Sequence, residues 1–294
     1  MDAPNPSAIP TFANRTPLHC GAVGLIVRDL NRLTAYYRAL LGLTVMEKSD
    51  ARARLGIDGT VLLELERAPH ALPDDVSTAG LYHTAFLMPT RTDLARWIVH
   101  IARHHVPISG ASDHDVSEAI YLDDPEGNGI EVYSDRTPER WRRDGKLIFQ
   151  KTDPLDIEDI LREIDPASAD YPAAPPGLRI GHVHLRVGDV VAAERFYVNA
   201  LGLEVTRRRT GATFMSTGGY HHHIACNVWH SEGAGKRDPR RAGLAWIGLE
   251  AADSAAFDAA RTRLQAAGAP LTQDADGFET HDPWGTRIRI TKAA

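Results

Sequence analysis

The sequence has very little cysteine. Of its 294 residues only Cys20 and Cys226 are cysteines, which argues against a fold held together by a framework of disulfide bonds. The chain does not need one, because 43% of its residues are hydrophobic and 24% are charged. A chain of this length and composition has enough residues for two domains with ordinary hydrophobic cores.

The sequence also lacks an excess of positive charge. Its 33 Lys and Arg against 39 Asp and Glu give a formal net charge of −6, which offers no electrostatic footprint for nucleic acid or anionic membranes. No apolar run approaches the roughly 18 residues of a membrane span, and the N-terminus lacks the basic-then-apolar pattern of a signal peptide. Neither a GxGxxG nor a P-loop pattern occurs, so no organic cofactor is predicted. We expect a cytoplasmic protein that acts on a small molecule.

What the sequence does have is internal repetition. The segment VGLIVRDLNRLTAYYRALLGLTV begins at Val23, and VHLRVGDVVAAERFYVNALGLEV begins at Val183, 160 residues later. Each combines an alternating strand pattern, an aspartate near a helix start, an aromatic pair on the helix and Leu-Gly-Leu at its end. The two segments therefore predict the same local structure twice.

A second pair of segments repeats in the same way. One copy is LYHTAFLMP, a helix over about 93–105 and YLDDPEGNGIEVY; the other is LAWIGLE, a helix over about 254–267 and HDPWGTRIRI. Asp124-Pro125 in the first copy corresponds to Asp282-Pro283 in the second. The glycine of each Asp-Pro-x-Gly predicts a tight turn before a final strand.

The chain is thus predicted to hold four units, each with a strand, a helix and further strands, in two tandem halves, 17–135 and 179–292. The units span 17–67, 80–135, 179–231 and 242–292. We interpret 1–16 as a flexible, proline-rich lead-in. We interpret 136–178 as a linker with a short helix over Leu155–Ile164, followed by the Pro/Ala-rich DPASADYPAAPPG.

Four tandem βαβββ units with an FYxxxLGL-type helix and DPxGNxIE before a last strand resemble the vicinal oxygen chelate superfamily. This superfamily includes glyoxalase I, bleomycin-resistance proteins and type I extradiol dioxygenases, and fold alone does not choose among them. The resemblance covers nearly all of the chain outside the lead-in and linker. It implies an α+β fold whose paired units form two open mixed-sheet barrels. GLYHTAFLMP, SDHDVSEAIYLDDPEGNGIEVY and GHVHLRV with GGYHHHIACNVW are more specifically similar to two-half catechol 2,3-dioxygenases.

That resemblance implies a metal site. Type I extradiol enzymes hold Fe(II) by two histidines and one carboxylate, which leaves positions open for substrate and O2. The matching positions hold His83 and Glu131 in the second unit and His182 in the third. The matching positions of the first and fourth units hold Ala22, Ala245 and Arg289. Since neither half has a full set, we predict that the second unit pairs with the third and the first with the fourth. One metal would then bind per chain, Fe(II) or Mn(II), because the same ligands serve both.

Two other interpretations remain open at this point. With pairing inside the first half, Glu64, His83 and Glu131 would hold the metal of a glyoxalase- or epimerase-like isomerase or lyase. A non-catalytic binding or resistance protein would keep the fold without a metal. Each residue also has an ordinary structural explanation, because a histidine on a strand is more often a hydrogen-bonded core residue than a ligand.

The resemblance further implies residues around the metal. His222 would be the acid–base histidine, and Tyr121 the active-site tyrosine ten residues before Glu131. His114 would contact the substrate, although its spacing to Tyr121 departs by about two residues from the family pattern. His184 lies two residues after a predicted ligand and therefore shares its strand face, where it too would contact the substrate.

The predicted catalytic histidine lies inside a run of three, His221-His222-His223. Alternation along an extended chain predicts that the two outer histidines point away from the barrel interior. An unperturbed histidine side chain has a pKa of about 6.5, which suits proton transfer near neutral pH. The predicted reaction is the opening of a catechol-type aromatic diol by O2 to a muconate semialdehyde-type product. Open barrels with exposed edges also lead us to expect a homo-oligomer.

Overall fold

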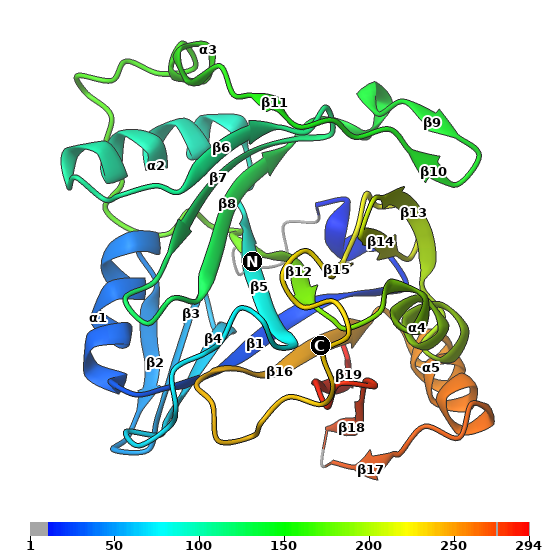
Figure 1. Cartoon of the computed structure of the whole chain (residues 1–294). Coiled ribbons are helices and arrows are strands. Elements are labelled where there is room, and N and C mark those ends of the chain that lie inside the picture. Colours follow the sequence, from blue (N-terminus) through cyan, green and yellow to red (C-terminus); the bar gives the residue numbers. More distant parts are fainter. Residues whose placement is uncertain (1–10, 275, 294) are drawn as a thin grey trace, which may run out of the picture.

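The computed structural model describes residues 11–274 and 276–293, which form two large mixed β-sheets with helices at their periphery (Figure 1). Residues 1–10 of the predicted lead-in lie outside the described residues. The fold is α+β, as predicted, and a large hydrophobic cluster includes buried residues from both sheets, among them Leu25 and Val183. In the described parts of the chain, no helix is long and apolar enough to cross a membrane.

The nine-stranded sheet contains the second and third predicted units, in the order β11-β6-β7-β8-β5-β12-β15-β14-β13. The second unit supplies β5 (Gly80–Leu87), β6 (Gly110–Asp113), β7 (Ser117–Asp123) and β8 (Gly129–Asp135). The third supplies β12 (Arg179–Arg186), β13 (Glu204–Arg209), β14 (Ala212–Ser216) and β15 (Ile224–Asn227). Antiparallel pairing of β5 with β12 joins the two units at the centre of this sheet.

The eight-stranded sheet contains the first and fourth units, in the order β17-β18-β19-β16-β1-β4-β3-β2. The first unit supplies β1 (Leu18–Val27), β2 (Thr44–Lys48), β3 (Arg52–Ile57) and β4 (Thr60–Arg67). The fourth supplies β16 (Gly243–Ala251), β17 (Thr272–Gln273), β18 (Gly277–His281) and β19 (Arg287–Lys292). Here β1 pairs antiparallel with β16. The units therefore pair across the two halves of the chain, which is the arrangement that the ligand positions required.

Each unit carries its helix between its first and second strands. These helices are α1 (Leu30–Leu41), α2 (Arg91–Arg103), α4 (Val190–Glu194, continued by a π-helical turn over Arg195–Ala200) and α5 (Ser254–Ala266). Each begins after a side chain that accepts a hydrogen bond from a backbone N–H of its first turn, which stabilises a helix start. These capping residues are Asp29, Thr90, Asp189 and Asp253. Helix α1 ends at Gly42, whose φ of +68° is the left-handed conformation that favours glycine.

The same buried hydrogen bond forms once within each half, and it explains the repeated motifs. The Tyr37 hydroxyl on α1 donates to Asp124 Oδ2 (2.9 Å), and the Tyr197 hydroxyl after α4 donates to Asp282 Oδ2 (3.1 Å). The helix aromatic and the Asp-Pro turn therefore meet within each half. Because strand pairing crosses the halves while these bonds lie inside them, each bond links a unit of one sheet to a unit of the other.

The segment 136–178 is more than the predicted linker. It forms the hairpin strands β9 (Arg143–Asp144) and β10 (Leu147–Ile148), the edge strand β11 (Asp153–Pro154) and helix α3 (Ile157–Leu161). The helix is shorter than predicted at both ends. Strand β11 pairs with β6 and so extends the nine-stranded sheet.

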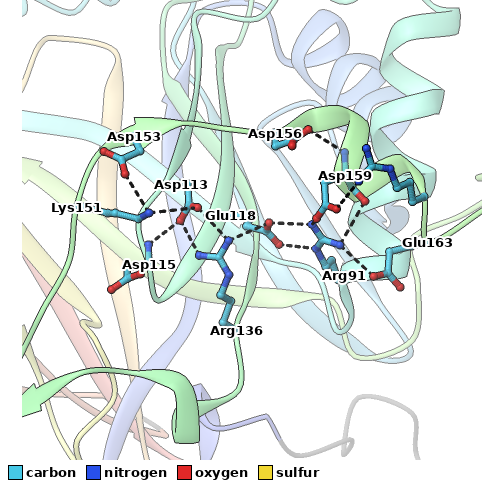
Figure 2. A network of polar contacts seen from close by, with 11 residues as sticks. Arg91, Asp113, Asp115, Glu118, Arg136, Lys151, Asp153, Asp156, Asp159 and Glu163 are labelled. Atoms are coloured by element: carbon cyan, nitrogen blue, oxygen red, sulfur yellow. Dashed lines mark hydrogen bonds and ion pairs between the residues drawn. The ribbon is translucent and has the colours of Figure 1, made fainter.

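Ion pairs attach this segment to the second unit, as Figure 2 shows. Arg91, at the start of α2, donates to Glu118 Oε2 (2.7 Å) and to Asp159 Oδ2 (2.6 Å). Arg136 also donates to Glu118, at Oε1 (3.1 Å). Glu118 is only 4% exposed, so its charge depends on these two guanidinium groups for compensation.

The expectation of a flexible lead-in is wrong for residues 11–16. Ala13–Arg15 form a short 3-10 turn. The Phe12 ring lies 5.3 Å from the Trp141 ring and 5.8 Å from the Tyr220 ring. The side chain of Phe12 thereby packs on aromatic residues of the segment 136–178 and of the second half, contacts that proline content near the N-terminus could not reveal.

Replacing Arg91 by Met is expected to destabilise the fold by about 1–3 kcal/mol, because a buried carboxylate loses one of its charged donors. Arg96→Met is the matched control on the same helix, since Arg96 only pairs with Asp93 at the surface (3.4 Å) and should cost about 0–1 kcal/mol. Urea unfolding of the two variants measures both values. Equal losses would show that the network around Glu118 does not stabilise the segment 136–178.

Candidate metal centre and active site

Three potential metal ligands come from three adjacent strands of the nine-stranded sheet. In the register of the sheet, Ala85 on β5 lies opposite Glu131 on β8 and opposite His182 on β12. Register partners on neighbouring strands project from the same face, and so do residues two apart on one strand. His83, two residues before Ala85, therefore projects on the same face as Glu131 and His182.

The three side chains converge. Glu131 Oε2 lies 2.9 Å from His83 Nε2 and 3.1 Å from His182 Nε2. One ligand atom from each residue lies within 4.8 Å of the others, and all three residues are buried. The contact from His182 is a hydrogen bond, whereas His83 Nε2, although close, has no partner in hydrogen-bonding geometry within the described residues. Two imidazole nitrogens directed at one carboxylate, one of them unsatisfied, fit a cation among them.

The protonation states of the cluster also fit a metal. Burial lowers the pKa of His182 to about 4, against the opposing effect of Glu131. Burial would raise the pKa of Glu131, but His182 and His83 outweigh it and hold that pKa well below its usual range. At neutral pH the site thus has a carboxylate and a neutral His182, and these are the forms that bind metal ions.

The three residues of the cluster line a cavity of roughly 530 Å³, a volume within the ordinary range for small-molecule sites. The sequence-predicted residues that line it are His83, His114, Tyr121, Glu131, His182, His184 and His222. Aromatic side chains of Tyr82, Phe214 and Trp229 form part of its wall. The structure therefore brings all seven predicted site residues to one cavity.

Tyr121 and His114 are joined by a hydrogen bond. Tyr121 lies opposite Glu131 in the register of β7 and β8, and its hydroxyl is 2.6 Å from His114 Nε2. The other ring nitrogen of His114 is 2.8 Å from the Lys151 carbonyl oxygen, which only accepts. A neutral His114 therefore donates to Lys151 and accepts from Tyr121. Burial, followed by the charge of Glu131, raises the pKa of Tyr121 well above its usual range, so the phenol stays protonated.

His184 lies across from His83 in the register of β12 and β5. Its ring centre is 4.9 Å from that of His83 and 4.8 Å from that of Tyr82. Asn227 Nδ2 is 3.0 Å from His184 Nε2 and donates to it. Burial lowers the pKa of His184 well below its usual range. His184 is thus a neutral, fixed ring on the cavity wall.

The histidine run was expected to alternate along an extended strand. It lies instead in the turn between β14 and β15. Only His222 lines the cavity, with its ring centre 4.1 Å from that of His182. His221 Nε2 instead contacts Asp135 Oδ1 (2.9 Å), and His223 Nε2 the Ala13 carbonyl oxygen (2.9 Å). The two outer histidines lie outside the cavity lining, where they were expected.

Several cavity residues have no counterpart in the predictions. Gln150 and Thr152 come from the segment interpreted as a linker, and Arg209 from the end of β13. Arg209 Nη1 donates to Thr152 Oγ1 (2.7 Å). No sequence pattern marks these residues, because they reach the cavity only through the packing of the segment 136–178 against the third unit.

The eight-stranded sheet has no equivalent cluster among the described residues. Glu64 lies on β4 of that sheet and binds Arg54 Nε through Oε2 (2.6 Å). Arg289, at the position of a ligand, lies 4.1 Å from the Trp246 ring and donates to Glu279 (3.3 Å). Glu64 does not join His83 and Glu131, so the ligand set of the isomerase interpretation is not assembled.

Comparison with known proteins agrees with this architecture. The model of the Glyoxalase/Bleomycin resistance protein/Dioxygenase superfamily matches residues 18–132 and 179–290. A catechol-2,3-dioxygenase of Bacillus subtilis (strain 168) is 37% identical over 272 residues, which cover 90% of this chain and 94% of the relative.

Solved structures show the same fold at low identity. Glyoxalase I from Zea mays is 16% identical, with a TM-score of 0.56 over 96% of this chain and 94% of its own. A protein from Bacillus subtilis subsp. subtilis strain 168 is 14% identical, with a TM-score of 0.60 over 93% of this chain and 84% of its own.

The geometry predicts which carboxylate binds a metal. Glu131→Gln should weaken the binding of one Fe(II) per chain by more than about 100-fold, since even changes beyond the ligands cost 10–100-fold. Glu64→Gln is the matched control and should retain one equivalent. Anaerobic titration with Fe(II), followed by metal analysis of the desalted protein, measures both. Retention by Glu131→Gln together with loss by Glu64→Gln would reverse the assignment.

Proposed function

Since the chain belongs to the glyoxalase, bleomycin resistance protein and dioxygenase superfamily, we propose that it is an extradiol dioxygenase. It opens a catechol-type aromatic diol beside the two hydroxyl groups, consumes O2, and gives a muconate semialdehyde-type product. The observation that carries this proposal is the convergence of His83, Glu131 and His182 in the lining of a cavity that His222 and Tyr121 also line.

The ligand set supports Fe(II), with Mn(II) as the alternative metal. His83, Glu131 and His182 would hold the metal through two imidazoles and one carboxylate, a ligand set that leaves positions for a diol and O2. When bound, the metal would hold the diol oxygens and O2 next to each other and carry electrons from the diol to O2. A metal isomerase or lyase would need a further carboxylate, and Glu64 is held by Arg54 in the other sheet.

The other cavity residues then have separate roles. His222 accepts a proton from a diol hydroxyl at the ring nitrogen that faces the cavity, and later returns a proton to the product. The protonated hydroxyl of Tyr121 donates to an oxygen of the substrate when it turns from His114. His184, fixed by Asn227, contacts the bound ring, while Phe214 and Trp229 provide an apolar wall for it.

The aromatic wall suits the face of an aromatic ring, and the volume of the cavity leaves room for substituents on that ring. The cluster is also shielded from the outer surface, because His83, Glu131 and His182 are each at most 6% exposed. Such shielding protects a reactive oxidised substrate from side reactions.

The test is oxygen consumption by protein that has been purified anaerobically and loaded with Fe(II). Addition of catechol should consume one O2 per diol and produce a yellow ring-opened product, measured with an oxygen electrode and by absorbance. Iron-loaded protein that consumes no O2 with catechol or its alkyl-substituted forms would contradict the proposed function. Such a result would favour the non-catalytic binding protein.

Replacing His222 by Phe should lower kcat by about 100- to 10,000-fold with KM close to that of the wild type, because a proton-transfer group contributes this much. His223→Asn is the matched control: it removes a buried histidine of the same run that does not line the cavity. Steady-state rates, with metal content and unfolding midpoints of each variant, make the comparison. Equal losses of kcat in both variants would show that His222 takes no part in the reaction.

A further inference from the structure

Two neighbouring histidines of the run are hydrogen-bonded to each other. His221 Nδ1 lies 2.8 Å from His222 Nδ1, and His221 Nε2 lies 2.9 Å from Asp135 Oδ1. Together they form a continuous chain from a carboxylate at the end of β8 to the imidazole that faces the cavity. His221 is fully buried and His222 is 7% exposed, so solvent does not compete for these bonds.

For an ionised Asp135 and a neutral His221, the donors and acceptors of the three groups set the direction of the bonds. An ionised carboxylate only accepts, so His221 Nε2 carries the hydrogen that is shared with Asp135. A neutral His221 then has a lone pair at Nδ1, which accepts the hydrogen of His222 Nδ1. The remaining nitrogen of His222, Nε2, is left without a hydrogen. It has no hydrogen-bond partner in residues 11–274 or 276–293, and its ring lines the cavity.

The surroundings of the chain hold it in place. The His221 ring lies 4.0 Å from the Tyr220 ring and 5.3 Å from the Trp141 ring, which restrict its orientation. Among the described residues, no Arg or Lys forms an ion pair with Asp135. The adjacent Arg136 binds Asp113 and Glu118 instead. The Asp135 carboxylate is thus available to a histidine.

We propose that Asp135 and His221 are positioning residues, which hold His222 in the tautomer that presents an unprotonated Nε2 to the cavity. The proposal rests on the proposed function for the reaction that His222 serves, but the tautomer itself does not. In the reaction, the diol O–H bond breaks as its proton binds Nε2, and the electron pair stays on the diol oxygen. The His222 Nδ1–H bond to His221 is kept throughout, so the ring does not turn.

Asp135→Asn is the most informative variant because it keeps the number of non-hydrogen atoms in the side chain. The amide can donate to His221 Nε2, which moves the hydrogen of His221 to Nδ1. His222 Nδ1 then becomes the acceptor, and His222 presents Nε2–H to the cavity. Asp113→Asn is the matched control, since Asp113 is a partly buried carboxylate of the same sheet that binds Arg136 (2.6 Å) and no histidine.

The tautomer can be read without activity, by two-bond 1H–15N NMR spectra of metal-free protein labelled with 15N-histidine. The signal of His222 is identified by its disappearance in His222→Phe. We expect the Nδ1–H tautomer in the wild type and in Asp113→Asn, and the Nε2–H tautomer in Asp135→Asn. An Nε2–H tautomer in the wild type, or an unchanged tautomer in Asp135→Asn, would overturn the proposal.

Kinetics provide the second readout. In the iron-loaded protein, Asp135→Asn should lower kcat by about 10- to 1,000-fold with little change in KM, as expected for a wrongly oriented base. In the His222→Phe background the same substitution should cause no further loss, because its effect passes through His222. Losses that multiply would overturn the positioning role. If the wild type cleaves no diol, the proposed function fails, and the NMR spectra still decide the tautomer.

Discussion

The antiparallel pairing of β5 with β12 is the constraint on which the site depends. It sets His83 opposite His184 and Ala85 opposite His182, while the parallel pairing of β5 with β8 sets Ala85 opposite Glu131. A slip of one residue in either register would turn a ligand to the other face of the sheet. The cluster is therefore a property of register, and it exists only because two units from different halves of the chain share a sheet.

Both sheets are built on the same plan, but only one carries a cluster of metal ligands within the described residues. In the other sheet, carboxylates are paired with arginines: Glu64 with Arg54, and Glu279 with Arg287 and Arg289. Buried or half-buried charges that are compensated in this way need no cation. The buried Tyr37–Asp124 and Tyr197–Asp282 bonds then join the two sheets, so the second sheet supports the first without repeating its chemistry.

The histidine run shows how one short segment serves structure and chemistry together. His223 binds the backbone of the N-terminal turn, His221 binds Asp135, and His222 alone lines the cavity. Their different surroundings follow from the turn between β14 and β15, which directs three consecutive side chains to three environments. The sequence could show that the outer two differ from the central one, but not that one of the outer two contacts it.

Repetition in the sequence determined the four units, because strand period and motif spacing are local properties. The cross-pairing and the seven residues that meet at the cavity were expected from the resemblance to the vicinal oxygen chelate superfamily. The absence of ligands at Ala22, Ala245 and Arg289 even indicated which units share a sheet. Only the tertiary structure decided that the segment 136–178 supplies Gln150 and Thr152 to the cavity. It also decided that His222 is hydrogen-bonded to His221, and His221 to Asp135. These contacts join residues that are distant in sequence or lie in irregular turns, where no periodicity records which side chains will meet.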